Sequence, residues 1–403
     1  MASLTPISRQ PLSMVLPAVA TAGGVAGFFV GTGLGATFLG IAIGATLVAA
    51  LAYVLIAFVQ NETISRWATI LGGGILGFAL FGPMGGILGL LAGWFFVFFI
   101  FWLYEGRYRA RLLPYMTSRQ VFGYYAFRVI CGAIFLFLIT PILVVLPLSF
   151  NAQDFFTFTP EMLRLDPDGY SLKHYRDFFT NNEWQRSFRN SLIIAPIATI
   201  ISVTLGTLAA IGLSQSHVPG RRAIMGILIS PMIVPLIISA TGMFFFYSDI
   251  GRFLEGTLGM DKTFVGYVKV VLAHAVLGIP FVIITVTATL VGFDRSLTRA
   301  AANMGAGPVK TFFSIQMPLI LPGVISGGLF AFITSFDEVV VILFVGSASQ
   351  KTLPWQMFTG LREQISPTIL AVATILVVIS IALLTTLELL RRRSERLRGL
   401  TPA

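Results

Sequence analysis

The stretch that decides the fold is Arg299-Ala300-Ala301-Ala302-Asn303-Met304-Gly305, followed by Ala306-Gly307-Pro308 and then by Val309 through Pro318. Asp294 and Ser296 stand just before the alanine-rich run and predict a capped helix start. Gly305 predicts a helix end in the left-handed conformation, and Gly307-Pro308 predicts the start of a second short helix that Pro318 ends. The stretch therefore reads as two helices joined by a tight turn.

The second of these helices has apolar residues at spacings of mostly three and four, namely Val309, Phe312, Phe313 and Ile315. This spacing predicts one apolar face, with Lys310 elsewhere on the helix. Because the stretch lies between two predicted membrane spans, we expect this face to lie outside the membrane and to contact a partner.

The composition is that of a polytopic membrane protein. Of 403 residues, 56% are hydrophobic and only 11% are charged, and the mean hydropathy is +0.87, which is too apolar for a water-soluble domain. The net charge of +10 is expected from basic cytoplasmic loops rather than from binding of nucleic acid. The single cysteine, Cys131, lies in an apolar run and cannot form an intrachain disulfide.

Residues 1–110 are a glycine-rich region in which we predict about four membrane spans. Met14 to Val59 is long enough for two crossings, and Trp67 to Tyr104 for two shorter ones that break at Gly82-Pro83. Glycines recur every four residues in both pairs, and small residues at this spacing let two helices approach closely. We expect an accessory bundle of two similar hairpins.

A basic segment separates this region from the rest of the chain. Residues 111–125 continue a run that contains Arg107, Arg109, Arg111 and Arg119, and the positive-inside rule places this linker in the cytoplasm. Six further spans are predicted within residues 126–395, at about residues 126–148, 191–213, 224–247, 267–291, 321–345 and 368–390. The basic tail, residues 391–403, then falls on the cytoplasmic side, as does the N-terminus.

The stretch from Arg299 to Pro318 resembles the coupling loop of ATP-binding-cassette (ABC) importer permeases. That loop reads E-A-A, three residues, G, nine residues, I-x-L-P, and the positions that match it in register are Ala300, Ala301, Gly305, Ile315 and Pro318. Arg299 stands at the usual glutamate position, which reverses a charge, and Met317 replaces leucine. The resemblance implies an all-α membrane fold with a six-helix permease core, in which residues 294–318 contact a separate ATPase subunit.

Other stretches extend this likeness over nearly all of residues 126–395. They include Gly169-Tyr170-Ser171-Leu172-Lys173-His174-Tyr175, Val218-Pro219-Gly220-Arg221-Arg222, Gly292-Phe293-Asp294-Arg295-Ser296-Leu297, Ser335-Phe336-Asp337-Glu338-Val339-Val340 and Thr352-Leu353-Pro354-Trp355-Gln356-Met357-Phe358. Together they are similar to the second permease of spermidine/putrescine-type systems. Residues 1–110 have no counterpart there.

This resemblance implies a multi-pass permease of the bacterial inner membrane that imports a polyamine or a related cationic amine. It also implies three kinds of partner: two copies of an ATPase subunit, a second permease, and a periplasmic or lipid-anchored substrate-binding protein. Opines, amino acids and other small solutes stay open as alternative substrates, because relatives with similar stretches carry them. No nucleic acid, metal or cofactor is expected.

Asp337 and Glu338 are the polar pair that could line a substrate pathway. They lie about 16 residues into the fifth core span, where ionised groups are costly and usually face a bundle interior or a water-filled cavity. On a continuous helix the two carboxylates would point about 100° apart, so that one could attract a cation while the other packs or pairs. The alternative is a pair that reaches the membrane surface or caps a kinked helix.

No group of residues in the sequence predicts covalent chemistry. His174, His217 and His274 fall on different levels of the predicted topology and cannot converge on a metal. The segment from Gly305 to Thr311 superficially resembles a phosphate loop, but no glycine directly precedes Lys310 and no strand leads into it. ATP must then be bound by another chain. An autonomous channel, a secondary transporter or a membrane-integral enzyme is the alternative class of function.

Overall fold

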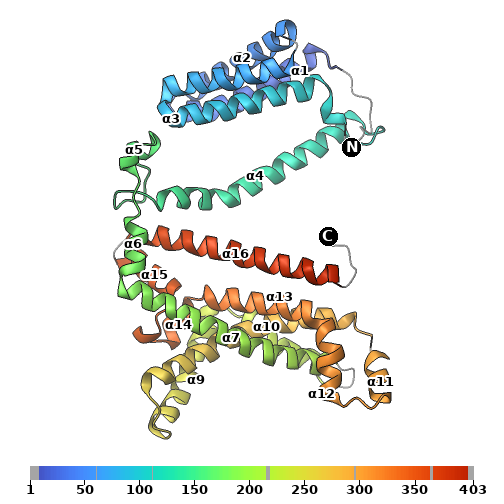
Figure 1. Ribbon diagram of the computed structural model, residues 1–403, viewed down its shortest axis with the longest axis vertical. Helices are drawn as coiled ribbons and strands as arrows, with labels where there is room; N and C mark the ends of the chain where they lie inside the picture. The colour runs from blue at the N-terminus through green and yellow to red at the C-terminus, as the bar shows by residue number, and fades with distance from the viewer. Residues whose placement is uncertain are drawn as a thin grey trace. The chain divides into compact units, whose positions relative to one another are not determined.

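The computed structural model describes residues 9–397, apart from Gln60, Arg111, residues 215–217, Arg295 and residues 364–365. It divides into two units, residues 1–171 and residues 172–403 (Figure 1). The regular elements that the described residues form are all helices, apart from one isolated bridge between Asn151 and Tyr170. This confirms the expected all-α class.

The first unit contains the N-terminal hairpins, the basic linker and the first predicted core span. Its helices are α1 (Leu12–Gly33), α2 (Thr37–Val54) with its continuation η1 (Leu55–Val59), α3 (Glu62–Tyr104), η2 (Arg107–Arg109), α4 (Ser118–Leu148), α5 (Pro160–Leu163) and η3 (Pro167–Gly169). The assignment of residues from 126 onward to a permease core, and of residues 1–110 to a separate accessory region, stays a prediction.

Glycine packing holds α1 against α2. A Cβ atom added to Gly27 would lie 2.0 Å from the carbonyl oxygen of Gly40, and one added to Gly23 would lie 2.4 Å from that of Gly44. Only glycine permits such an approach, because any side chain would force the two backbones apart. The four-residue glycine spacing thus forms the contact face of a helix hairpin, as predicted.

The helix α3 is a second hairpin rather than one straight rod. Gly82 has φ 69° and ψ −158°, which reverses the chain immediately before Pro83. Gly77 then packs on Gly85, and Gly73 on Gly89, with added Cβ atoms 2.0 to 2.6 Å from the facing carbonyl oxygens. The break expected at Gly82-Pro83 is confirmed, and the two hairpins use the same glycine contact.

The second unit is a helical bundle with several short segments at its ends. Its elements are α6 (Lys173–Thr180), α7 (Asn182–Ser214), α8 (Arg221–Ile233), α9 (Leu236–Gly256), α10 (Lys262–Val291), α11 (Ser296–Asn303), α12 (Pro308–Thr311), η4 (Phe312–Gln316), α13 (Met317–Phe336), α14 (Val340–Val345), η5 (Ala348–Gln350), α15 (Leu353–Glu363) and α16 (Thr368–Leu397). Residues 398–403 of the predicted basic tail lie outside the described residues.

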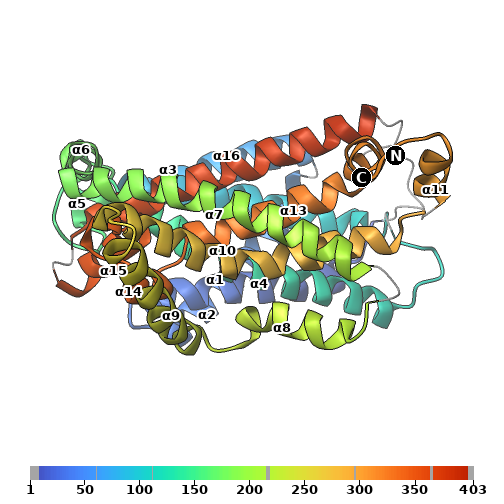
Figure 2. The same cartoon turned by 90° about the horizontal axis from the view of Figure 1, so that it is seen from below.

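Three long helices form the centre of this bundle. The helices α7, α10 and α13 run alongside one another (Figures 1 and 2). Small residues let them approach, since Gly278 of α10 lies against Ser202 of α7, and Gly327 of α13 lies against Thr285 of α10. The buried faces around these contacts are mainly apolar, so hydrophobic packing stabilises the bundle.

Two of the predicted core spans are broken. The third bends by 105° between α8 and α9, at Val234-Pro235, because proline at the start of α9 supplies no backbone N–H to continue α8. The fifth is interrupted between α13 and α14 by residues 337–339. Hydropathy predicted both as single spans.

The described residues contain eight helices long and apolar enough to cross a membrane, or nine with the bent pair α8 and α9. Because α3 doubles back at Gly82, its two arms count separately and the total becomes ten. This agrees with four N-terminal spans followed by six core spans.

Candidate coupling loop and substrate pathway

The first helix of the predicted coupling loop, α11, begins with the expected cap. The backbone N–H of Ser296 donates to Oδ1 of Asp294 at 2.8 Å, and its hydroxyl donates to Oδ2 at 2.7 Å. These two hydrogen bonds, the backbone one foremost, hold the pKa of the Asp294 carboxyl below its ordinary value. A carboxylate at this position also stabilises the positive end of the helix dipole.

The turn after α11 is the one that the sequence predicts. Gly305 has φ +78°, its N–H donates to the carbonyl oxygen of Ala302, and the N–H of Ala306 donates to that of Ala301 at 3.0 Å. This pattern closes a helix at a left-handed residue. The prediction that Gly305 ends the first helix is confirmed.

The second helix differs from the prediction at Pro318. The segments α12, η4 and α13 follow one another without a break, so the helix that begins at Pro308 continues to Phe336 and Pro318 lies inside it. The π-helical turn of η4, which ends at Gln316, two positions before Pro318, explains this continuity. A π-helical turn leaves one carbonyl without its usual partner four residues on, and proline has no N–H to supply one.

The loop exposes an apolar surface that we call the coupling patch, made of Met304, Val309 and Phe313. Their side chains are 80%, 69% and 64% exposed. Phe312, by contrast, packs against the core cluster formed by α7, α10 and α13. The predicted apolar face is therefore split, with one side anchoring the helix and the other free for a partner.

The motif residues have different environments. Arg299, Ala300 and Pro318 are exposed, Ile315 is half-buried, and Ala301, within α11, is only 1% exposed. Met304, which the sequence analysis did not single out as a contact residue, is the most exposed member of the coupling patch. The sequence did contain a signal for this role, because Met304 directly precedes Gly305, the residue predicted to end the first helix.

Asp337 and Glu338 lie in a helix break rather than on one continuous helix. The N–H of Asp337 closes the last turn of α13 by donating to the carbonyl oxygen of Ile333. Glu338 is 7% exposed, and its Oε1 accepts the backbone N–H of Val341 at 2.7 Å. Asp337 is exposed. The 100° relation expected for a continuous helix is wrong, because the chain leaves the helix between the two carboxylates.

His274 braces the same break from α10. Its Nδ1 lies 3.1 Å from the carbonyl oxygen of Ser335 and 2.9 Å from the Ser335 hydroxyl oxygen, and the ring is fully buried. Among the described residues, no group of three or more His, Cys, Asp or Glu side chains is placed to hold a metal ion. His217 lies outside those residues.

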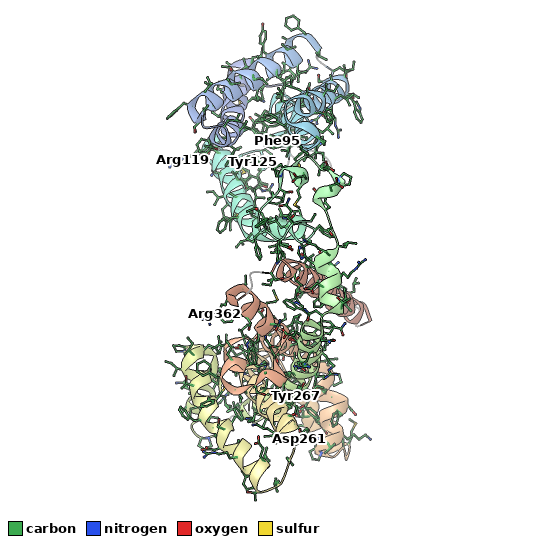
Figure 3. All side chains as sticks on the ribbon, turned by 90° about the vertical axis from the view of Figure 1, so that its left-hand side faces the viewer. Phe95, Arg119, Tyr125, Asp261, Tyr267 and Arg362 are labelled. Carbon is green, nitrogen blue, oxygen red and sulfur yellow. The ribbon has the colours of Figure 1, made fainter. Side chains whose placement is uncertain are left out.

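A polar network missed by the sequence analysis pins the segment after α14. The amide nitrogen of Asn190 donates to the carbonyl oxygens of Ser349 and Lys351, both at 2.9 Å. Tyr267, labelled in Figure 3, donates its hydroxyl to Oδ1 of Asn190 at 2.5 Å. Since Asn190 is fully buried and its partners lie between 77 and 161 residues away in the sequence, only the folded bundle reveals this anchor.

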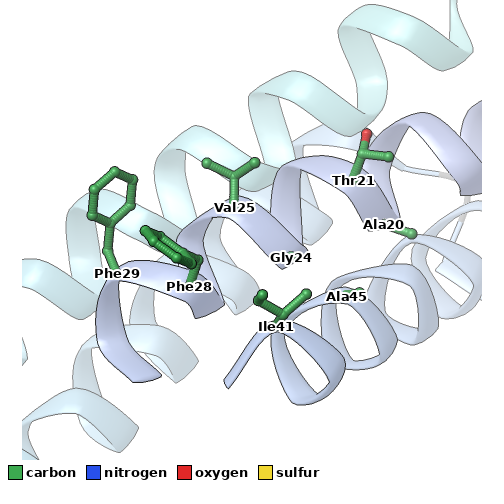
Figure 4. A pocket seen from close by; sticks show the side chains of 8 residues that line it. All are labelled: Ala20, Thr21, Gly24, Val25, Phe28, Phe29, Ile41 and Ala45. Carbon is green, nitrogen blue, oxygen red and sulfur yellow. The ribbon is translucent and has the colours of Figure 1, made fainter. Parts of the chain in front are cut away.

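An open groove of about 600 Å³ lies on the first hairpin, between α1 and α2. Figure 4 shows the side chains that line it, among them Val25, Phe28, Phe29 and Ile41. The hydroxyl of Thr21 donates to the carbonyl oxygen of Ala18, and none of the lining residues is charged. Such a groove suits hydrocarbon rather than a charged solute.

This chain is similar to known proteins over most of the second unit, and the longer alignments exceed the length of that unit. Residues 202–398 match the family model described as binding-protein-dependent transport system inner membrane component. The spermidine/putrescine transport system permease protein PotC of Haemophilus influenzae is 30% identical over 262 residues, which is 65% of this chain and 95% of that protein. The putrescine transport system permease protein PotI of Escherichia coli K12 is 29% identical, over 60% of this chain and 82% of PotI.

A solved structure shares the fold. It is a chain in the crystal structure of a bacterial ABC transporter involved in the import of the acidic polysaccharide alginate, with a TM-score of 0.51 and 16% identity, covering 68% of this chain and 98% of that one. At this identity the likeness concerns the arrangement of helices alone.

Proposed function

This chain belongs to the family of binding-protein-dependent transport system inner membrane components, and from that membership we propose that it imports a polyamine or a related cationic amine. It is a multi-pass permease of an ABC importer. The observation that carries the substrate proposal is the exposed carboxylate of Asp337 at a helix break, in a chain whose relatives are named as spermidine and putrescine permeases.

The two carboxylates at the break have different roles in this proposal. Glu338 is nearly buried and is engaged by the first turn of α14, so it acts as a helix cap. Asp337 is exposed, and an ionised carboxylate within a span does not face lipid because desolvation there costs several kcal/mol. Asp337 therefore faces water or a second permease, where it attracts the positive charge of the substrate.

The coupling patch is the contact for the ATPase in this proposal. Two copies of an ATPase subunit bind residues 294–318 of this chain and the corresponding loop of a second permease. The patch of Met304, Val309 and Phe313 enters an apolar groove on the ATPase. The reversed charge at Arg299 then calls for an acidic or neutral ATPase residue opposite it. ATP is bound and hydrolysed on those subunits, and this chain carries out no covalent step.

The remaining parts follow from the same family relationship. A periplasmic or lipid-anchored substrate-binding protein docks on the outer segments, including the one anchored by Asn190. The basic linker, the coupling loop and both termini are then cytoplasmic. Opines or amino acids are the alternative substrates, and an autonomous channel or secondary transporter is the alternative class of function.

Purification from native membranes at natural expression, with mass spectrometry of every chain recovered, tests the assembly. Recovery of an ATPase subunit and a second permease is the expected result, whereas recovery of this chain alone would contradict it. The purified assembly in liposomes should then take up labelled spermidine or putrescine only with ATP and the binding protein. Uptake without the ATPase would favour an autonomous transporter, and ATP-dependent uptake of an amino acid or opine instead would change the substrate class.

A further inference from the structure

A second cavity, of about 240 Å³, lies in the N-terminal hairpin region at the end of α3 that meets the basic linker. Its lining comes from both arms of α3 and from η2, and consists of Glu62, Arg66, Trp94, Val97, Phe98 and Arg107. Nothing in the proposed transport cycle uses this cavity. Its lining combines charged groups near a helix end with aromatic groups inside a span.

The two arginines of the cavity, Arg66 and Arg107, differ in whether they have a protein partner. Arg107 donates to both carboxylate oxygens of Glu62 and also forms an ion pair with Glu105, so Glu62 is already neutralised. Arg66 is exposed and forms no hydrogen bond or ion pair with any residue that the structure describes. Arg107 is therefore paired with two carboxylates, and Arg66 is the guanidinium of the cavity that has no protein partner among the described residues.

The opposite wall is apolar and belongs to the second arm of α3. Trp94 and Phe98 stack with their ring centroids 5.9 Å apart and their planes at 12°, and their side chains are 46% and 47% exposed. Val97, which is 2% exposed, also lines the cavity. These residues lie two to three turns inside the helix end, at a depth where glycerol and acyl carbons of a lipid would lie.

We propose that this cavity binds an anionic glycerophospholipid, with Arg66 on the headgroup phosphate and Trp94 and Phe98 against the first carbons of an acyl chain. Guanidinium recognises phosphate through paired hydrogen bonds, and basic pockets between membrane helices suit anionic headgroups. A soluble phosphate ester would satisfy Arg66 but would leave the aromatic wall exposed. The combination therefore favours a lipid of the leaflet on this side.

Native mass spectrometry of the purified full-length protein, titrated with phosphatidylglycerol or phosphatidylcholine, tests the proposal. Arg66→Gln should lower the affinity of one phosphatidylglycerol site roughly tenfold, the size expected for losing one charge-assisted hydrogen bond. Arg119→Gln is the matched control, because Arg119 is also exposed, has no described partner and is not among the residues that line the cavity. It should leave the affinity unchanged.

Equal losses in both variants would overturn the proposal, because they would show only a general attraction of the basic surface for anionic lipid. Equal binding of phosphatidylcholine and phosphatidylglycerol would also overturn it. Soluble glycerol 3-phosphate gives the last distinction: if it displaces the lipid at millimolar concentration, the site is one for soluble phosphate esters. In the expected result, quenching of tryptophan fluorescence by brominated phosphatidylglycerol falls in Trp94→Phe and in Arg66→Gln but not in Arg119→Gln.

Discussion

Glu338 accepts a hydrogen bond from the backbone N–H of Val341 at 2.7 Å, so a nearly buried carboxylate caps the helix that restarts after the break. The exposed neighbour, Asp337, has no such role. One carboxylate of the pair therefore holds the backbone and the other is free to meet a ligand. This division separates the effects expected of substitutions at the two positions.

Glu338→Ala should destabilise the protein by about 1 kcal/mol or more, since it removes a cap and leaves a buried N–H without an acceptor. Glu338→Gln keeps an acceptor oxygen and should remain close to wild type. Thermal unfolding in detergent, followed by the fraction that stays monodisperse, measures this. An alanine variant as stable as the glutamine variant would show that the hydrogen bond contributes nothing to the break.

Asp337→Asn should raise the apparent KM for a cationic amine roughly tenfold, because it removes the charge that attracts the substrate while keeping the side-chain shape. Its abundance and unfolding temperature should not change. The measurement is ATP-dependent uptake in liposomes with the complete importer, and Glu338→Gln is the paired control. If uptake by Asp337→Asn is unchanged, Asp337 does not line the pathway.

Gly305→Asp should abolish coupling between ATP hydrolysis and uptake without removing the protein from the membrane. The reason is conformational: Gly305 has φ +78°, and an added Cβ atom would meet nothing within 4 Å, so the side chain would strain the left-handed backbone of the turn rather than clash with a neighbour. Gly307→Ala is the control, since Gly307 has φ −67° and equally free space. Normal uptake by Gly305→Asp would contradict the prediction.

Phe313→Ala should weaken binding of the ATPase subunit by about 2 kcal/mol, as expected for an aromatic residue at the centre of an apolar contact. Phe312→Ala should act differently, because Phe312 packs against the core and its loss lowers the unfolding temperature. Co-purification of the ATPase, together with thermal unfolding of the permease, distinguishes these effects. Retention of the ATPase by Phe313→Ala at wild-type levels would exclude the coupling patch as the contact.

Gly27→Ala should separate the first hairpin, since its new methyl group would lie 2.0 Å from the carbonyl oxygen of Gly40. Gly33→Ala, on the same helix but with nothing within 4 Å, should be neutral. We expect a lower unfolding temperature for Gly27→Ala alone, measured on the full chain in detergent. Similar unfolding temperatures would show that the hairpin yields without cost.

The features that could be predicted from the sequence are those that depend on a few neighbouring residues. The left-handed turn at Gly305 and the hairpin reversal at Gly82 were predictable, because each depends on a glycine and its immediate neighbours. The continuation of the helix through Pro318 was not, since it depends on a π-helical turn that absorbs the missing N–H. The roles of Asp337 in transport and of residues 294–318 in coupling remain predictions.

The sequence by itself determined the class of protein, the number of membrane crossings and the helix-turn-helix of the coupling loop, because hydropathy, glycine spacing and capping act within a few turns of chain. Only the tertiary structure decided which carboxylate of the pair is free. His274 contacts Ser335, which is 61 residues away in the sequence and lies just before the break at residues 337–339. A contact between residues so far apart leaves no local pattern in the sequence.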